Sequence, residues 1–75
     1  MSEEWLEAFN DLIRLAYENG RAGTSDAYIR QSTAEWCALY EGDPERQEIG
    51  RRCEKVLLEA HQRGRKEAAQ CPHTS

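Results

Sequence analysis

The segment Ser2–Gly20, with the sequence SEEWLEAFNDLIRLAYENG, decides the fold of this 75-residue chain. Placed at about 100° intervals around a helical axis, its apolar side chains cover an arc of roughly 200°. A helix on the surface of a small bundle needs a narrower apolar stripe. We therefore expect this helix to lie between two others or to present one apolar flank to another molecule. The arc consists of Trp5, Leu6, Ala8, Phe9, Leu12, Ile13, Leu15, Ala16 and Tyr17.

Capping residues and apolar periodicity predict two more helices. Thr24 or Ser25 is placed to cap the second helix. Asp43 is placed to cap the third, with Pro44 at the first helical position, where the missing amide hydrogen is no loss. The expected core stripe of the second helix holds Ile29, Trp36, Leu39 and Tyr40, and that of the third holds Ile49, Cys53, Val56, Leu57 and Ala60.

These signals predict an all-α fold, a three-helix bundle in a single small domain over residues 1–70. The helices are expected at about 2–19, 25–40 and 44–69, with Ser2 capping the first helix and with Asn19 and Gly20 ending it. The helix at 2–19 is expected to be central. Residues 71–75 contain Pro72 and are expected to form a flexible tail.

Charge is unevenly distributed along the chain, which has a net charge of −4. Residues 1–43 hold nine acidic and three basic residues, whereas residues 44–75 hold five acidic and seven basic ones. This acidic balance is not typical of a nucleic-acid-binding protein. No apolar run approaches the length of about 20 residues that a membrane span needs, and the acidic start is unlike a signal peptide. We expect a cytoplasmic protein without a membrane partner.

The residues that could carry catalysis or bind a metal are few and widely spaced. Cys37, Cys53 and Cys71 are an odd number of cysteines without a CxxC pair. Together with His61 and His73 they match none of the short ligand spacings of zinc sites. A nucleophile would also need a base and a third group to orient it. The sequence therefore predicts no enzyme, no cofactor and no metal.

A protein–protein interaction is the function that the sequence favours. Leu6, Ile13 and Tyr17 lie on one flank of the first helix, within about 40° of one another, and we expect them to contact a partner or a second copy. Of these two, we favour contact with a second copy in a homodimer, because a chain this short has a small hydrophobic core. Leu58 points away from the core stripe of its helix, toward Arg51 and Arg65, and the three form a second candidate surface. The expected role is to bind and inhibit or modulate a larger protein, as small phage or mobile-element inhibitors of host factors do.

The alternative is a small DNA-binding or transcription-regulating protein. The second and third helices could form a unit like a helix-turn-helix, in which the third helix would offer base-reading side chains. Asp43, Glu45 and Glu48 would then lie near phosphates, which argues against this alternative. The candidate reading residues are Arg46, Gln47, Arg51 and Arg52.

Overall fold

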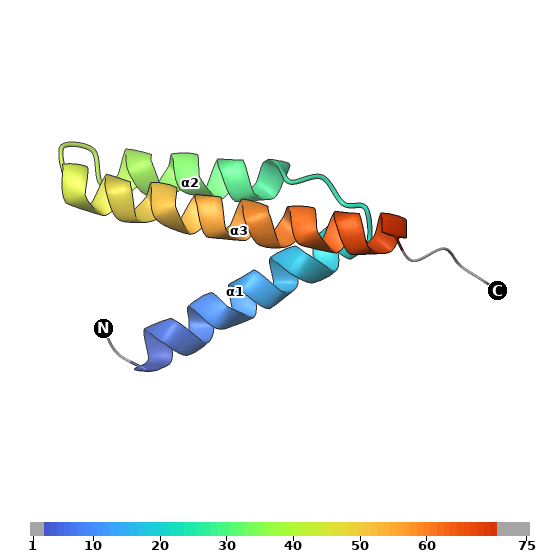
Figure 1. Cartoon of the computed structure of the whole chain (residues 1–75). Helices are drawn as coiled ribbons and strands as arrows, with labels where there is room; N and C mark the ends of the chain where they lie inside the picture. The colour runs from blue at the N-terminus through green and yellow to red at the C-terminus, as the bar shows by residue number, and fades with distance from the viewer. Residues whose placement is uncertain (1–2, 71–75) are drawn as a thin grey trace.

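A computed structural model describes residues 3–70, and the fold over this range is three α-helices (Figure 1). They are α1 (Glu3–Arg21), α2 (Ala27–Leu39) and α3 (Pro44–Gln70). The predicted all-α three-helix fold is confirmed for the described part of the chain. The predicted cap at Ser2 and the predicted tail at 71–75 lie outside the described residues.

The end of α1 lies two residues beyond the predicted position. Gly20 stays helical, and Gly23 takes the left-handed conformation with φ of +79°. The Gly23 amide donates to the Gly20 carbonyl over 3.1 Å, and the Thr24 amide donates to the Asn19 carbonyl over 3.0 Å. This pair of bonds is the Schellman arrangement, which satisfies carbonyls at a helix end. The glycine that ends the helix is therefore Gly23 and not Gly20.

The predicted capping residue is confirmed at the start of α3 but not at the start of α2, where the N-cap is Asp26 instead of Thr24 or Ser25 and its side chain makes no capping bond. The Ala27 amide donates to Ser25 Oγ over 3.1 Å at the start of α2. The Arg46 amide donates to Asp43 Oδ1 over 3.2 Å, as expected of an N-cap that precedes a helix beginning at Pro44. α2 and α3 lie side by side and antiparallel, joined by a short turn (Figure 1).

The central helix is α3 and not α1, contrary to the sequence-based expectation. α3 packs against both other helices, whereas the backbones of α1 and α2 do not approach each other closely within residues 3–70, and these two helices touch only through side chains, as where Asn19 Nδ2 donates to the Tyr28 hydroxyl over 3.2 Å. α1 crosses α3 near the ends of both helices and then diverges from it, so that the arrangement is an open V (Figure 1). The wide apolar arc of α1 is therefore not covered by a helix on each side.

The crossing of α1 and α3 is made by four small, buried residues. A Cβ at Gly20 would lie 2.0 Å from the His61 carbonyl oxygen, and a Cβ at Gly64 would lie 2.1 Å from the Tyr17 carbonyl oxygen. Ala16 and Ala60 are buried beside them. Each helix thus contributes one alanine and one glycine, four residues apart, and the absence of larger side chains lets the two backbones touch.

The fully buried core of the described residues is small. Ala16, Ile29 and Ala60 are its buried apolar members. The backbone extends only 13 Å in its thinnest direction, so the arrangement of the three helices is flat. Several predicted core positions are open as a result: Leu39 is 72% exposed and Ile49 is 46% exposed. Trp36, Cys53 and Leu57, also predicted for the core, are half-buried.

Candidate functional site

The open side of the V contains an apolar groove of about 230 Å³. All three helices contribute to it, and we call the lining residues of α1 and α2 its walls and those of α3 its floor. A cavity of about 150 Å³ lined by apolar side chains is large enough to bind benzene. The groove therefore has room for one or two large apolar side chains. Its lining residues are Trp5, Ala8, Phe9, Leu12, Ile29, Ser32, Thr33, Trp36, Ile49, Gly50, Cys53, Glu54 and Leu57.

The wall formed by α1 carries large side chains that the fold leaves accessible. Trp5 is 40% exposed and Leu12 is 49% exposed. The rings of Trp5 and Phe9 stack with their centroids 5.3 Å apart. Burying one such side chain completely is worth about 1.5–3 kcal/mol, so several accessible ones together form a surface that a partner would gain much by covering.

The opposite wall is held in place by Trp36 of α2. Its indole Nε1 donates to the Arg46 carbonyl over 2.6 Å. The ring also lies against Gly50, where a Cβ would come within 2.4 Å of Trp36 Cδ1. Gln47 Nε2 adds a bond of 3.1 Å to the Cys37 carbonyl. These contacts fix α2 on α3, so this side of the groove is preformed.

The groove contains one acidic side chain and one thiol. Glu54 is half-buried at the floor, and it has no ion pair among residues 3–70. Burial raises the pKa of the Cys53 thiol above its usual value of 9.0 because the thiolate would lose solvation. Cys53 is consequently a protonated, weakly nucleophilic side chain at neutral pH.

The closed end of the V is held together by polar contacts between helices. The Tyr17 hydroxyl donates to the Glu67 carboxylate, and this bond raises the pKa of Tyr17 above its usual value of 10.0. His61 is buried in α3, with its Nε2 at 2.7 Å from the Thr24 carbonyl oxygen, which requires a proton on Nε2. These contacts hold the loop at 22–26 and the end of α1 against α3.

The structure places the predicted flank of α1 partly inside the molecule. Ile13 and Tyr17 are half-buried and pack against the chain's own core, which comes from all three helices. Leu6 is 46% exposed and remains accessible. The groove instead receives the other part of the apolar arc, which the sequence reasoning did not select. A role of Leu6, Ile13 and Tyr17 in an interface stays a prediction.

The second predicted surface is not brought together as one patch. Leu58 packs against the core cluster. Arg51 Nη1 lies 3.5 Å from Glu48 Oε2 on the exposed surface. Arg65 is exposed with Arg63 and Lys66 on the C-terminal half of α3. Their role in binding also stays a prediction.

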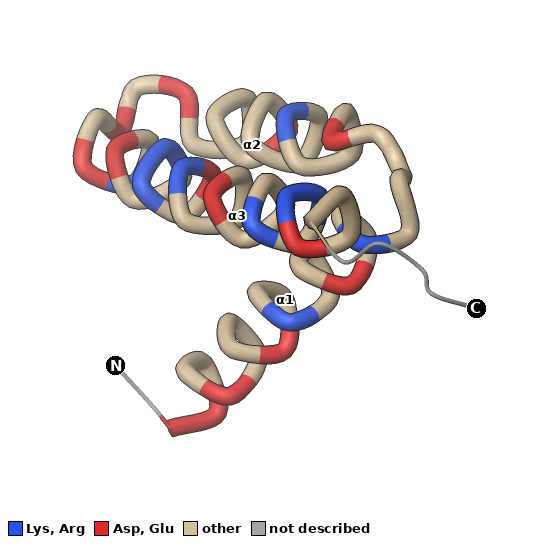
Figure 2. The backbone as a smooth tube through the Cα atoms, turned by 45° about the vertical axis from the view of Figure 1, so that its right-hand side comes forward, with Lys and Arg blue, Asp and Glu red and all other residues tan. Residues whose placement is uncertain are grey.

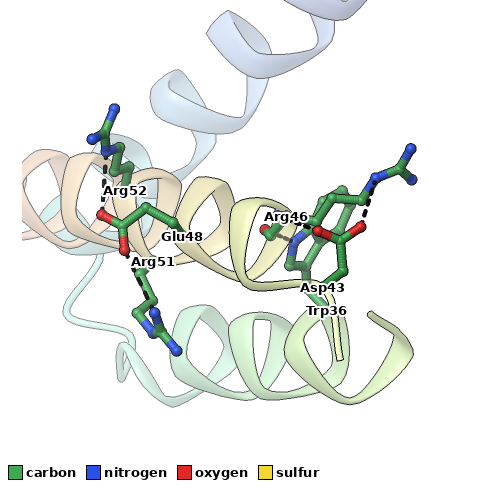
Figure 3. Close-up of polar contacts among 6 residues, drawn as sticks. All are labelled: Trp36, Asp43, Arg46, Glu48, Arg51 and Arg52. Atoms are coloured by element: carbon green, nitrogen blue, oxygen red, sulfur yellow. Dashed lines mark hydrogen bonds and ion pairs between the residues drawn. The ribbon is translucent and has the colours of Figure 1, made fainter. Parts of the chain in front are cut away.

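The residues that would read bases in a helix-turn-helix are engaged in contacts within the chain (Figure 3). Glu48 pairs with both Arg51 and Arg52, and Asp43 pairs with Arg46 over 3.5 Å. The α2–α3 pair is an antiparallel hairpin, whereas the helices of a helix-turn-helix cross at about 90–120°. Neither observation favours the DNA-binding alternative.

Comparison of the chain with known protein families, with characterised proteins and with solved structures gives no match. Among residues 3–70, no group of three or more histidine, cysteine or acidic side chains is arranged to hold a metal. None of the three described helices combines the length and the apolar character needed to cross a membrane.

Two features of the site were missed by the sequence reasoning. The pair Ala16 and Gly20 has the same spacing as the pair Ala60 and Gly64, and two small residues four apart on each of two helices are a signal for close approach. No comparable signal in the sequence identifies His61 as a buried contact residue, because its partner is the backbone carbonyl of Thr24 in a distant loop.

Proposed function

We propose that the protein is an interaction module that binds a larger protein through the apolar groove between α1 and α2 and thereby inhibits or modulates it. One observation supports this most directly: Trp5, Leu12 and Ile49 line a groove in the middle of the fold and remain 40–49% exposed. Contiguous apolar surface of this kind marks interaction sites on small soluble proteins. The homodimer that the sequence predicts uses a different surface, the flank of Leu6, Ile13 and Tyr17, and a second copy bound in the groove would be a competing use of the groove.

Affinity capture with matched variants tests this function. The tagged chain is compared with Leu12→Gln, which changes the groove wall, and with Leu39→Gln, which changes an exposed leucine that does not line the groove. Both substitutions are at accessible positions, so both variants should stay folded, which circular dichroism checks. A protein partner captured by wild type and Leu39→Gln, but not by Leu12→Gln, supports the proposal.

Two other results would contradict it. Nucleic acid recovered in place of protein, and lost on nuclease treatment, would favour the DNA-binding alternative. Capture of the same proteins by all three variants would mean that the groove is not the binding surface. Sedimentation equilibrium of the purified chain measures separately whether a second copy binds.

A further inference from the structure

We infer that the groove takes an amphipathic helix of a partner protein, one whose apolar stripe is flanked by lysine or arginine. This inference rests on the proposed function and specifies the partner's chemistry. Three properties of the groove lead to it: its apolar lining, its lack of backbone hydrogen-bonding edges, and the acidic groups around it.

A helix fits this groove better than an extended segment does. The walls and floor are helices, whose interior backbone groups already bond within each helix. An extended peptide would bring its own amides and carbonyls into an apolar site without partners, whereas a helix satisfies them internally. Trp5 and Leu12 lie seven residues apart, about 10 Å along α1, which matches apolar anchors two turns apart on a guest helix. The guest would complete a four-helix arrangement.

The charges around the groove that have no ion pair within residues 3–70 favour a basic guest. The arginines that lie one helical turn from a lining residue are each paired with an acidic side chain, as Arg30 is with Asp26 and Arg46 is with Asp43. Glu54 lines the floor. Glu4 lies one turn from Ala8 on α1, and Glu35 lies three residues from Ser32 on α2, so both adjoin the lining. None of these three carboxylates has an ion pair within residues 3–70. No lysine or arginine of the described chain lines the groove.

The same charges disfavour a second copy as the occupant. Among the described residues, most of the exposed large apolar side chains lie on α1, namely Trp5, Leu6, Leu12 and Leu15, and the outer half of this helix carries Glu3, Glu4, Glu7 and Asp11 (Figure 2). Placing α1 of one molecule in the groove of another would bring acidic residues together, and like charges across an interface weaken it.

The tryptophans of the chain can report whether the groove is occupied. Its two tryptophans, Trp5 and Trp36, both line the groove, so intrinsic fluorescence reports binding of a tryptophan-free peptide. The test peptide is a helix of about 18 residues, or five turns, with leucine at positions i, i+3, i+4 and i+7 and lysine elsewhere. The control peptide carries glutamate in place of lysine. We expect saturable binding of the lysine peptide, weakened about tenfold or more by Leu12→Gln but not by Leu39→Gln.

Two charge variants distinguish the effect of the acidic residues at the groove from the effect of the net charge of the chain. The triple variant Glu4→Gln, Glu35→Gln and Glu54→Gln neutralises the groove acids. The control triple variant Glu18→Gln, Glu41→Gln and Glu59→Gln makes the same change in net charge at positions that neither line the groove nor lie one turn from a lining residue. We expect only the first triple variant to weaken binding strongly and to reduce its dependence on salt between about 0.05 and 0.5 M.

Several outcomes overturn the inference. Equal binding of the two peptides, or equal effects of the two triple variants, would show that the groove acids select nothing. A dimer in sedimentation equilibrium that Leu12→Gln dissociates would make a second copy the occupant. If capture of a protein is lost in Leu12→Gln but not in the triple variant of Glu4, Glu35 and Glu54, the inference fails and the proposed function stands. If no binding of any kind depends on Leu12, the proposed function fails as well.

Discussion

Replacing Gly64 with alanine tests the crossing of α1 and α3. On helix propensity alone, Gly64→Ala should stabilise α3 by about 1 kcal/mol. The new Cβ, however, would lie 2.1 Å from the Tyr17 carbonyl oxygen and 2.9 Å from the Arg21 amide nitrogen. Both are backbone atoms, so the helices must move apart by about 1 Å, and a gap of this size removes a quarter to a half of each dispersion contact across the crossing.

The expected net effect is a loss of about 2–3 kcal/mol, because overpacking costs of about 1–3 kcal/mol or more add to the lost contacts of Ala16 and Ala60. For a domain of this size that loss lowers the melting temperature by roughly 10–20 °C. Urea unfolding followed by circular dichroism measures it. The exposed change Ala34→Gly serves as the control for helix propensity. A Gly64→Ala variant that gains about 1 kcal/mol, the full propensity effect, would refute the crossing geometry.

Three further predictions concern individual contacts. Asp43→Ala should cost about 1 kcal/mol of folding free energy through loss of the cap on the Arg46 amide, with Asp43→Asn close to wild type in urea titration. Trp36→Phe should cost about 1 kcal/mol in the same assay, because the indole bond to Arg46 is lost while most of the ring remains. The Tyr17 phenol should titrate with a pKa above 10.0, and with a pKa closer to 10.0 in Glu67→Gln, as measured by NMR of the ring carbons. Its raised pKa favours the folded state below pH 10, and this contribution is lost as the pH rises through the folded-state value.

The local structure could largely be predicted from the sequence. Asp43 and Pro44 identified the residue at which α3 begins, because a cap and a first-turn proline act within a few residues. The end of α1 could not be predicted as well. Asn19 and Gly20 are suitable for a helix end, but Gly20 is needed against His61, so the helix continues to Arg21 and Gly23 supplies the left-handed turn.

The arrangement of the helices could not be predicted from apolar arcs alone. The wide arc of α1 was consistent with two neighbours, and it also fits one neighbour plus an open surface. These two arrangements differ in the distance between the helices. That distance depends on the pairing of Gly20 with His61 and of Gly64 with Tyr17, which are separated by more than 40 residues of sequence. The same limit explains why Ile13 and Tyr17 were selected for a contact surface while Leu12 was not.

The crossing and the groove have a common cause in the sizes of side chains along α1. Near its end, Ala16 and Gly20 let the backbone touch α3, at a distance that leaves no room for large side chains between the helices. Toward its start, Trp5 and Phe9 lie on the same apolar arc and are too large for that spacing, so the helices diverge and the groove opens between them. It follows that the crossing residues set the width of the groove although they do not line it. A substitution at the crossing that leaves the chain folded should therefore also change the affinity for a helix bound in the groove.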